Sequence, residues 1–163
     1  MKTLASALVV IVLVVTALAA PAYAQGSGRA PSSGDVHWKG QAGLVFGGDD
    51  VGFLLGLGGE ARPFDSKQIE VNGDLNWMRL SGRNGLYVSA NGLYHFNTND
   101  STVEPYAGAG LGVTHFEGTE AFPQIVGGLD FKRTRRPMRL ELRFLLPDGD
   151  TTTVLSLGFG FGR

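Results

Sequence analysis

The stretch MRLELRFLL, residues 138–146, decides the fold class, because its apolar and charged residues alternate one by one. In a β-strand, successive side chains point to opposite faces. One face would then carry Met138, Leu140, Leu142, Phe144 and Leu146, and the other Arg139, Glu141 and Arg143. A helix would spread these charges around its circumference. The segment therefore predicts a strand with one apolar and one polar face.

The same alternation recurs along the rest of the chain and predicts eight strands. They are expected at 37–47, 51–62, 68–80, 85–97, 102–116, 121–132, 138–147 and 151–161. The segments between them, such as GGDD, SGRNG and PDGD, have turn composition, and every connection is short. No segment after residue 35 has helical periodicity. The sequence therefore predicts an all-β protein in which an antiparallel up-and-down meander of eight strands closes into a barrel.

The first 36 residues differ from the rest in composition. Lys2, a long apolar run and the small-x-small pattern Ala22-Tyr23-Ala24 predict a signal peptide over 1–24 that is cleaved after Ala24. A retained membrane anchor is the alternative. Residues 25–36 are rich in Gly, Ser and Pro and predict a flexible leader, which leaves 37–163 as one barrel domain. The chain has no cysteine and a net charge of −1, which exclude disulfides and disfavour nucleic acid as a partner.

Alternation alone does not say whether the apolar face points into the barrel or out of it. The polar face is mostly Gly, Ser, Asn and Gln with few charges, which suits the narrow lumen of an eight-stranded barrel. The segments also approach the roughly 9 to 11 residues that a tilted strand needs to cross a bilayer. Aromatic residues lie near the expected strand ends, as membrane interfaces favour: Trp38, Phe46, Phe53, Phe64, Trp77, Phe96, Phe116, Phe122, Phe131, Phe144 and Phe161. These features predict a transmembrane barrel, and a soluble periplasmic barrel that binds a small apolar ligand is the alternative.

Charged residues inside such a lumen should pair, because an unpaired buried charge is costly. Glu141 lies between Arg139 and Arg143 on one strand face. Across the two neighbouring connections, Asp130 is expected to meet Arg139 and Arg62 to meet Glu70. The sequence therefore predicts a structural charge network in the lumen formed by Arg62, Glu70, Asp130, Arg139, Glu141 and Arg143.

The last strand, in LSLGFGFGR at 155–163, would place Leu155, Leu157, Phe159 and Phe161 toward lipid. A signal peptide, eight alternating strands and a final strand that closes on an aromatic residue resemble the small outer membrane β-barrel proteins of the OmpA and OmpX kind. The resemblance covers residues 36–163 and is one of pattern. It implies residence in the outer membrane, outer membrane lipid as the surroundings, a periplasmic N-terminus, and insertion by the barrel assembly machinery that reads the terminal strand.

Some barrels of this size modify lipids, so the three histidines, His37, His95 and His115, need attention. The lipid A deacylase type has a His-x-Ser arrangement, and here Asn97 stands where the serine is needed. Ser89 shares a face with His95 but lies about 20 Å away along a strand. The sequence predicts no catalytic, metal or cofactor site. Acidic turns at one rim could collect divalent cations, although solvated turn residues are the ordinary interpretation.

These observations predict a non-enzymatic, monomeric outer membrane barrel with a structural or envelope-interaction role. Its lumen should be closed, since side chains just fill an eight-stranded barrel and conducting porins need about 16 to 18 strands. A lipid-modifying outer membrane enzyme is a third interpretation, after the soluble ligand-binding barrel.

Overall fold

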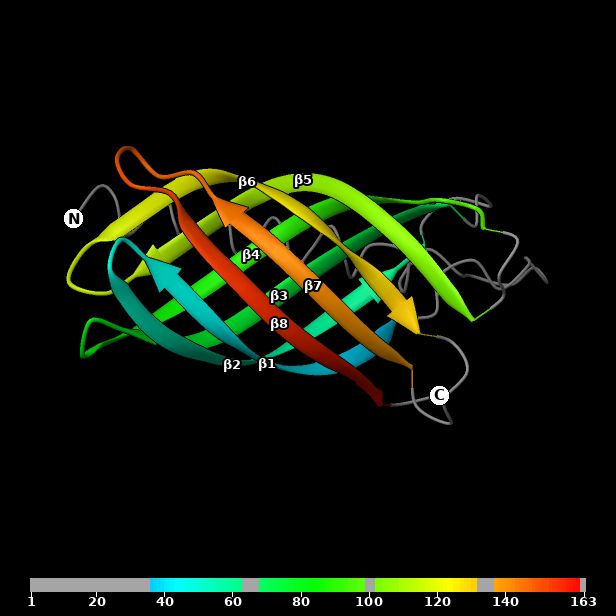
Figure 1. Ribbon diagram of the computed structural model, residues 1–163, viewed down its shortest axis with the longest axis horizontal. Coiled ribbons are helices and arrows are strands. Elements are labelled where there is room, and N and C mark those ends of the chain that lie inside the picture. Colours follow the sequence, from blue (N-terminus) through cyan, green and yellow to red (C-terminus); the bar gives the residue numbers. More distant parts are fainter. Residues whose placement is uncertain (1–35, 63–67, 99–101, 132–136, 162–163) are drawn as a thin grey trace, which may run out of the picture.

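The computed structural model describes residues 36–62, 68–98, 102–131 and 137–161, which form eight strands (Figure 1). The strands are β1 (His37–Gly47), β2 (Asp50–Ala61), β3 (Ile69–Leu80), β4 (Arg83–His95), β5 (Val103–His115), β6 (Thr119–Phe131), β7 (Met138–Leu145) and β8 (Thr152–Phe161). Among these residues, no helix is long and apolar enough to cross a membrane. The expected signal peptide and nearly all of the expected leader lie outside the described residues and stay predictions.

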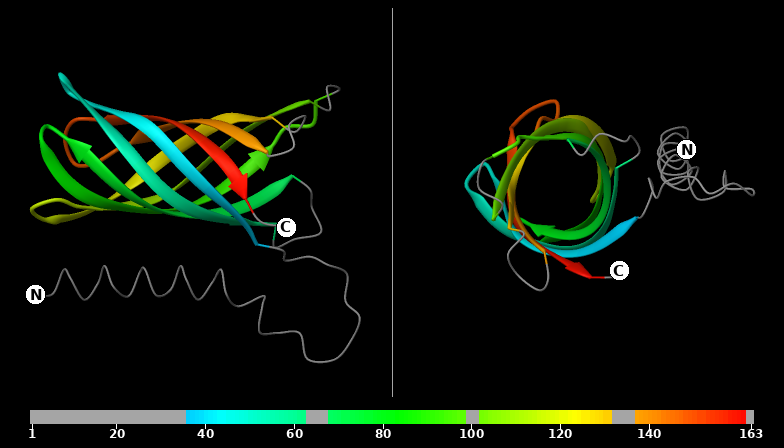
Figure 2. Two further views of the ribbon diagram at one scale, coloured as in Figure 1. Left: turned by 90° about the horizontal axis from the view of Figure 1, so that it is seen from below. Right: turned by 90° about the vertical axis from the view of Figure 1, so that its right-hand side faces the viewer.

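Each strand pairs antiparallel with its neighbour in sequence, and the last strand closes on the first. The closing pair of β1 and β8 runs in register from Trp38 opposite Phe161 to Gly47 opposite Thr152. Seen end-on, the strands form one continuous ring (Figure 2). The predicted eight-stranded up-and-down barrel is therefore confirmed.

The two ends of the barrel differ in their connections. At one end, which we call the tight-turn end, β1 joins β2 through 48–49 and β3 joins β4 through 81–82. Gly48 (φ 57°), Ser81 (φ 53°) and Gly82 (φ 75°) are left-handed, as two-residue hairpin turns require. Because the turn at 81–82 is so short, β4 begins at Arg83, two residues before its predicted start. The other end, which we call the termini end, holds the start of β1 and the end of β8.

The barrel has its apolar face outside and its polar face inside. Exposed large apolar residues occur on every strand, for example Leu44, Leu55, Leu75, Leu86, Leu111, Ile125, Leu142 and Leu157. Buried polar residues fill the interior: Lys39, Gln41, Glu70, Asn72, Asp74, Asn76, Ser89, Asn91, His95, Thr114, Gln124, Arg139, Glu141, Arg143 and Ser156. This polarity is the reverse of a soluble barrel's and matches a protein whose outer solvent is lipid.

Most of the expected interfacial aromatics do face outward, near both ends. Trp38, Phe96 and Phe161 are exposed near the termini end, and Phe46 and Trp77 toward the tight-turn end. Two of the expected aromatics are errors of the sequence analysis: Phe122 points into the lumen and is 4% exposed, and Phe116 packs against the buried residues of the lumen. The alternation of β6 explains the position of Phe122, since Phe122, Gln124 and Val126 are alternate residues on the inward face of this strand. Phe64 lies outside the described residues.

Candidate functional site: the lumen

The interior near the tight-turn end is apolar. Its buried residues form one cluster, which we call the apolar half of the lumen: Val45, Leu54, Met78, Tyr87, Phe122, Leu145 and Val154. The rings of Tyr87 and Phe122 stack with centroids 6.3 Å apart. Leu80 and Phe116 pack against the cluster. Since seven of the eight strands contribute to it, the cluster forms a hydrophobic layer across the barrel at this level.

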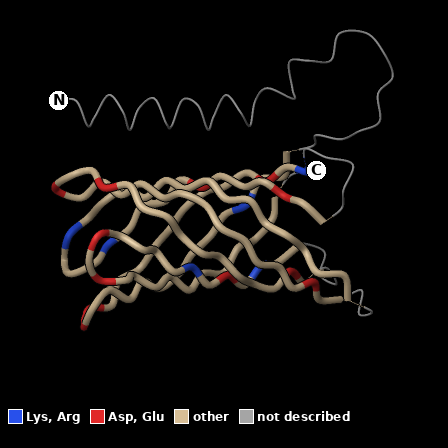
Figure 3. The backbone as a smooth tube through the Cα atoms, turned by 90° about the horizontal axis from the view of Figure 1, so that it is seen from above, with Lys and Arg blue, Asp and Glu red and all other residues tan. Residues whose placement is uncertain are grey.

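The interior toward the termini end carries most of the lumen's charges, and we call it the charged half. It contains Lys39, Glu60, Arg62, Glu70, Asp74, His95, Glu104, Asp130, Arg139, Glu141 and Arg143. Figure 3 shows acidic and basic residues toward this end of the barrel and a further set of both signs at the tight-turn end. Two arginines of β7, Arg139 and Arg143, organise this half.

Arg143 lies at the boundary between the two halves and is 1% exposed. Its Nη2 is 2.6 Å from Asp74 Oδ2, and its Nε donates to Glu141 Oε1 at 2.5 Å. Its Nη1 donates to Ser89 Oγ at 3.0 Å. Lys39 Nζ lies 3.3 Å from the other oxygen of Asp74. Two buried cations and two buried carboxylates therefore compensate each other in the middle of the barrel.

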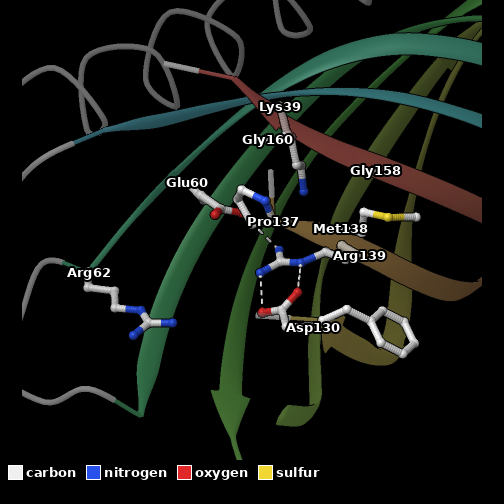
Figure 4. A pocket seen from close by; sticks show the side chains of 10 residues that line it. Lys39, Glu60, Arg62, Asp130, Pro137, Met138, Arg139, Gly158 and Gly160 are labelled. Carbon is white, nitrogen blue, oxygen red and sulfur yellow. Dashed lines mark hydrogen bonds and ion pairs between the residues drawn. The ribbon is translucent and has the colours of Figure 1, made fainter. Parts of the chain in front are cut away.

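Arg139 organises the part of the charged half that is nearer the termini end (Figure 4). Its Nε and Nη2 donate to the two oxygens of Asp130 at 2.6 and 2.8 Å, which is the bidentate geometry of a strong pair. Its Nη1 lies 2.9 Å from Glu70 and 3.0 Å from Glu60. The guanidinium also lies over the ring of Tyr106, 4.7 Å from its centroid.

The two arginine centres are linked through Tyr106, whose hydroxyl donates to Glu141 Oε2 at 2.8 Å. A layer of amides adds further cross-lumen bonds. Gln41 donates to Asn76 at 2.6 Å and Asn91 donates to Asn72 at 2.8 Å. The lumen is thus crossed by hydrogen bonds from the middle of the barrel to the termini end.

Glycines on the inward face make room for this network. A Cβ on Gly58 would lie 2.1 Å from Asp74 Oδ1 and 2.8 Å from Lys39 Cε. A Cβ on Gly128 would lie 2.4 Å from the hydroxyl oxygen of Tyr106. No real Cβ fits at such distances, so these two positions allow the charged side chains to reach across a narrow barrel.

The structure brings the residues of the expected charge network into the lumen, with different partners in part. Asp130 meets Arg139, and Arg62 Nη2 lies 3.6 Å from Glu70 Oε2 at the solvent rim, where Arg62 is 39% exposed. Glu141 binds Arg143, whereas it reaches Arg139 only by way of Tyr106.

Sequence reasoning missed Lys39, Glu60, Asp74, His95 and Glu104 as members of this network. The alternation of their strands did place Asp74 and His95 on the polar face. Asp74 meets Arg143 across the lumen, however, and the pairs of Arg143 with Asp74 and of Arg139 with Glu70 are each 69 residues apart in sequence. Parity gives the face of a residue, but only the diameter and stagger of the closed barrel decide which opposite residue it meets.

The histidines and the turn charges also have defined places. His95 is buried in the charged half, and Ser89 contacts Asp74 and Arg143 rather than a histidine. His115 is exposed at the tight-turn end, with Nδ1 2.8 Å from Thr119 Oγ1. At the same end Arg83 Nη1 lies 3.2 Å from Glu117, and Ser81 donates to Asp50.

An apolar outer surface around a filled, charged interior defines the protein as a transmembrane β-barrel. The family described as "Outer membrane protein beta-barrel domain" matches residues 10–162. The chain therefore belongs to the outer membrane protein β-barrel domain family, which places it among outer membrane proteins. A comparison with curated proteins gave no significant match.

Several solved structures are similar to this chain. The N-terminal β-barrel domain of OprF from Pseudomonas aeruginosa is 19% identical with a TM-score of 0.58, over 77% of this chain and 97% of that chain. Neisserial surface protein A, NspA, is 16% identical with a TM-score of 0.60, over 77% and 94%. The outer membrane enzyme PagL is 18% identical with a TM-score of 0.56, over 77% and 99%. At these identities the likeness concerns the fold alone.

Proposed function

We propose that the protein is a non-enzymatic outer membrane barrel with a structural or envelope-interaction role and a lumen closed to solutes. The observation that carries this proposal is the filling of the lumen at successive levels. The apolar half forms one layer, the amides and the Arg143 centre form the next, and the Arg139 centre lies nearest the termini end. A solute would have to displace all three.

The proposal also covers the insertion of the barrel into the membrane and the lipid around it. β8 exposes Leu155, Leu157, Phe159 and Phe161 on its outer side. These residues suit contact with outer membrane lipid and recognition of the terminal strand by the barrel assembly machinery. A monomer is sufficient, since the ring closes within one chain.

Conductance measurements test whether the lumen is closed. The refolded protein is reconstituted into planar bilayers beside a 16-stranded porin as the positive control. We expect no discrete conductance steps from this protein at salt concentrations at which the porin conducts. Reproducible steps that scale with protein concentration would show an open path through the lumen and contradict the proposal.

A lipid-modifying hydrolase is the second candidate, and one observation favours it. The exposed contact of His115 with Thr119 places a hydroxyl beside a ring nitrogen that can act as a base. Among the described residues, however, no ion pair joins a carboxylate to His115, and an orienting acid completes such sites. The test compares the mass of lipid A in cells that express the wild type, Thr119→Val or no barrel. We expect identical lipid A in all three, whereas a product that appears only with the wild type would establish the enzyme.

A further inference from the structure

His95 lies at the end of β4 and is surrounded by acidic side chains from three other strands. Its Nε2 is 3.1 Å from Glu70 Oε2 on β3. Its Nδ1 is 3.2 Å from Glu104 Oε2 on β5 and 3.7 Å from Asp130 Oδ2 on β6. The imidazole is 1% exposed. Both ring nitrogens therefore face carboxylate oxygens inside the barrel.

This arrangement needs a positive species. Within the described part of the chain, neither ring nitrogen of His95 has hydrogen-bonding geometry to any partner. In a neutral imidazole one nitrogen carries no hydrogen, so its lone pair would face a carboxylate oxygen in a buried place. Such a contact is repulsive unless a proton or a metal cation lies between the two atoms. Whichever nitrogen takes that cation, the other can donate its N–H to a carboxylate.

The charges around His95 lead to the same conclusion. Four carboxylates gather here, from Glu60, Glu70, Glu104 and Asp130, and two arginines face them, Arg62 and Arg139. Lys39 pairs with Asp74 deeper in the lumen. Among the described residues, four carboxylates therefore face two arginines here, and Arg62 is partly in solvent. Such acidic surroundings favour a bound cation.

The acidic groups are also held in place. Arg139 binds both oxygens of Asp130 and one oxygen of Glu70, so neither carboxylate is free to turn away from His95. Supporting hydrogen bonds of this kind orient metal ligands in proteins. Ligand atoms of Glu70, His95 and Asp130 lie within 4.8 Å of one another. Separations of this size let a small ion reach all three at about 2.0 to 2.2 Å after modest side-chain movement.

We propose that Glu70, His95 and Asp130 bind a divalent transition metal ion, with Glu104 within reach as a further oxygen ligand. One imidazole nitrogen with carboxylate oxygens fits Zn²⁺ and its neighbours, whereas Ca²⁺ and Mg²⁺ prefer oxygen ligands alone. A cavity of about 130 Å³ is lined by Asp130, Arg139 and the partly exposed Arg62, so it reaches one of the three ligands from the termini end (Figure 4). The site ties β3, β4 and β6 together and is independent of the role proposed above.

The test measures metal binding by the refolded, tag-free full chain in detergent micelles, after removal of metal with a chelator. Zn²⁺ is titrated by calorimetry, and Co²⁺ is titrated by its visible absorption, which reports nitrogen and oxygen ligation. His95→Gln removes the nitrogen ligand, and His115→Gln is the matched control at the opposite end of the barrel. Folding of every variant is checked by heat-modifiable migration on a gel.

We expect one saturable Zn²⁺ site in the wild type and in His115→Gln. Affinity should fall by more than about tenfold in His95→Gln, since changing groups that merely support a ligand already costs 10- to 100-fold. If His95→Gln does not fold, Glu104→Gln should still weaken binding, and Zn²⁺ should raise the unfolding midpoint of the wild type above its value in chelator. Absence of saturable binding, equal binding by His95→Gln, or equal response to Ca²⁺ would overturn the proposal.

Discussion

The two halves of the lumen fill the same barrel by opposite means. The apolar half near the tight-turn end consists of seven buried residues in non-directional contact, apart from the hydroxyl of Tyr87, which donates to Gln124 and accepts from Arg143. The charged half depends on a few long side chains, and Arg139 and Arg143 each hold several carboxylate or hydroxyl partners. We therefore expect a substitution in the apolar half to lower stability in proportion to the buried surface that it removes. A substitution in the charged half should disturb several interacting groups at once. Substitutions in each half test this contrast.

Arg143→Met should have the largest effect. It removes the cation between Asp74 and Glu141 and leaves both carboxylates buried. Breaking a buried pair in this way should lower the free energy of unfolding by about 3 to 5 kcal/mol. Denaturant titration of the barrel in lipid vesicles measures the change. Arg83→Met is the control, because Arg83 pairs with Glu117 on the exposed rim, and an equal loss in both variants would contradict the special place of Arg143.

Val45→Ala tests the apolar half. It deletes two methyl groups from the buried cluster, at about 0.8 kcal/mol each, and leaves a small cavity, so we expect a loss of about 2 to 3 kcal/mol. The same titration in vesicles measures it. Val51→Ala removes the same groups from an exposed position and should change stability much less. If Val45→Ala proved as costly as Arg143→Met, the apolar half would be as sensitive as the charged half.

Gly58→Ala tests how tightly the charged half is packed. The added methyl would meet Asp74 Oδ1 and Lys39 Cε, and overpacking of this kind costs about 1 to 3 kcal/mol. Gly92→Ala is a matched control, because nothing lies within 4 Å of its Cβ position. The unfolding midpoints of the two variants should therefore separate. Identical midpoints would mean that the charged side chains rearrange without cost.

Arg62→Ala should have the smallest effect. Arg62 lies 3.6 Å from Glu70 and 3.8 Å from Glu104 at the solvent rim of the charged half. Exposed pairs of this kind contribute less than about 1 kcal/mol, and salt screens them. Unfolding measured at low and high salt should show a difference from the wild type that shrinks as salt is added. A loss as large as that of Arg143→Met would place Arg62 inside the network rather than at its edge.

Sequence alone was sufficient for the fold, because a period of two separates the faces of every strand and short turns fix the order of pairing. It also anticipated that Asp130 and Arg139 lie near each other, since they are neighbours across one connection. It did not anticipate the contacts of Arg143 with Asp74, or the acidic surroundings of His95. The contacts of Arg143 with Asp74 and of His95 with Asp130 join strands that do not pair, β7 with β3 and β4 with β6, and they depend on the curvature of the closed barrel. Phe122 was misplaced because its aromatic character was weighed above the parity of its strand.

The central claim is that the outer apolar face lies in lipid and the lumen does not. The chain has two tryptophans, Trp38 and Trp77, and both face outward, at 57% and 38% exposure. Their intrinsic fluorescence can be measured after refolding into vesicles of unlabelled or brominated lipid. We predict strong quenching by the brominated lipid and weak quenching by aqueous acrylamide. Fluorescence unaffected by brominated lipid would place the tryptophans away from lipid and contradict the transmembrane barrel.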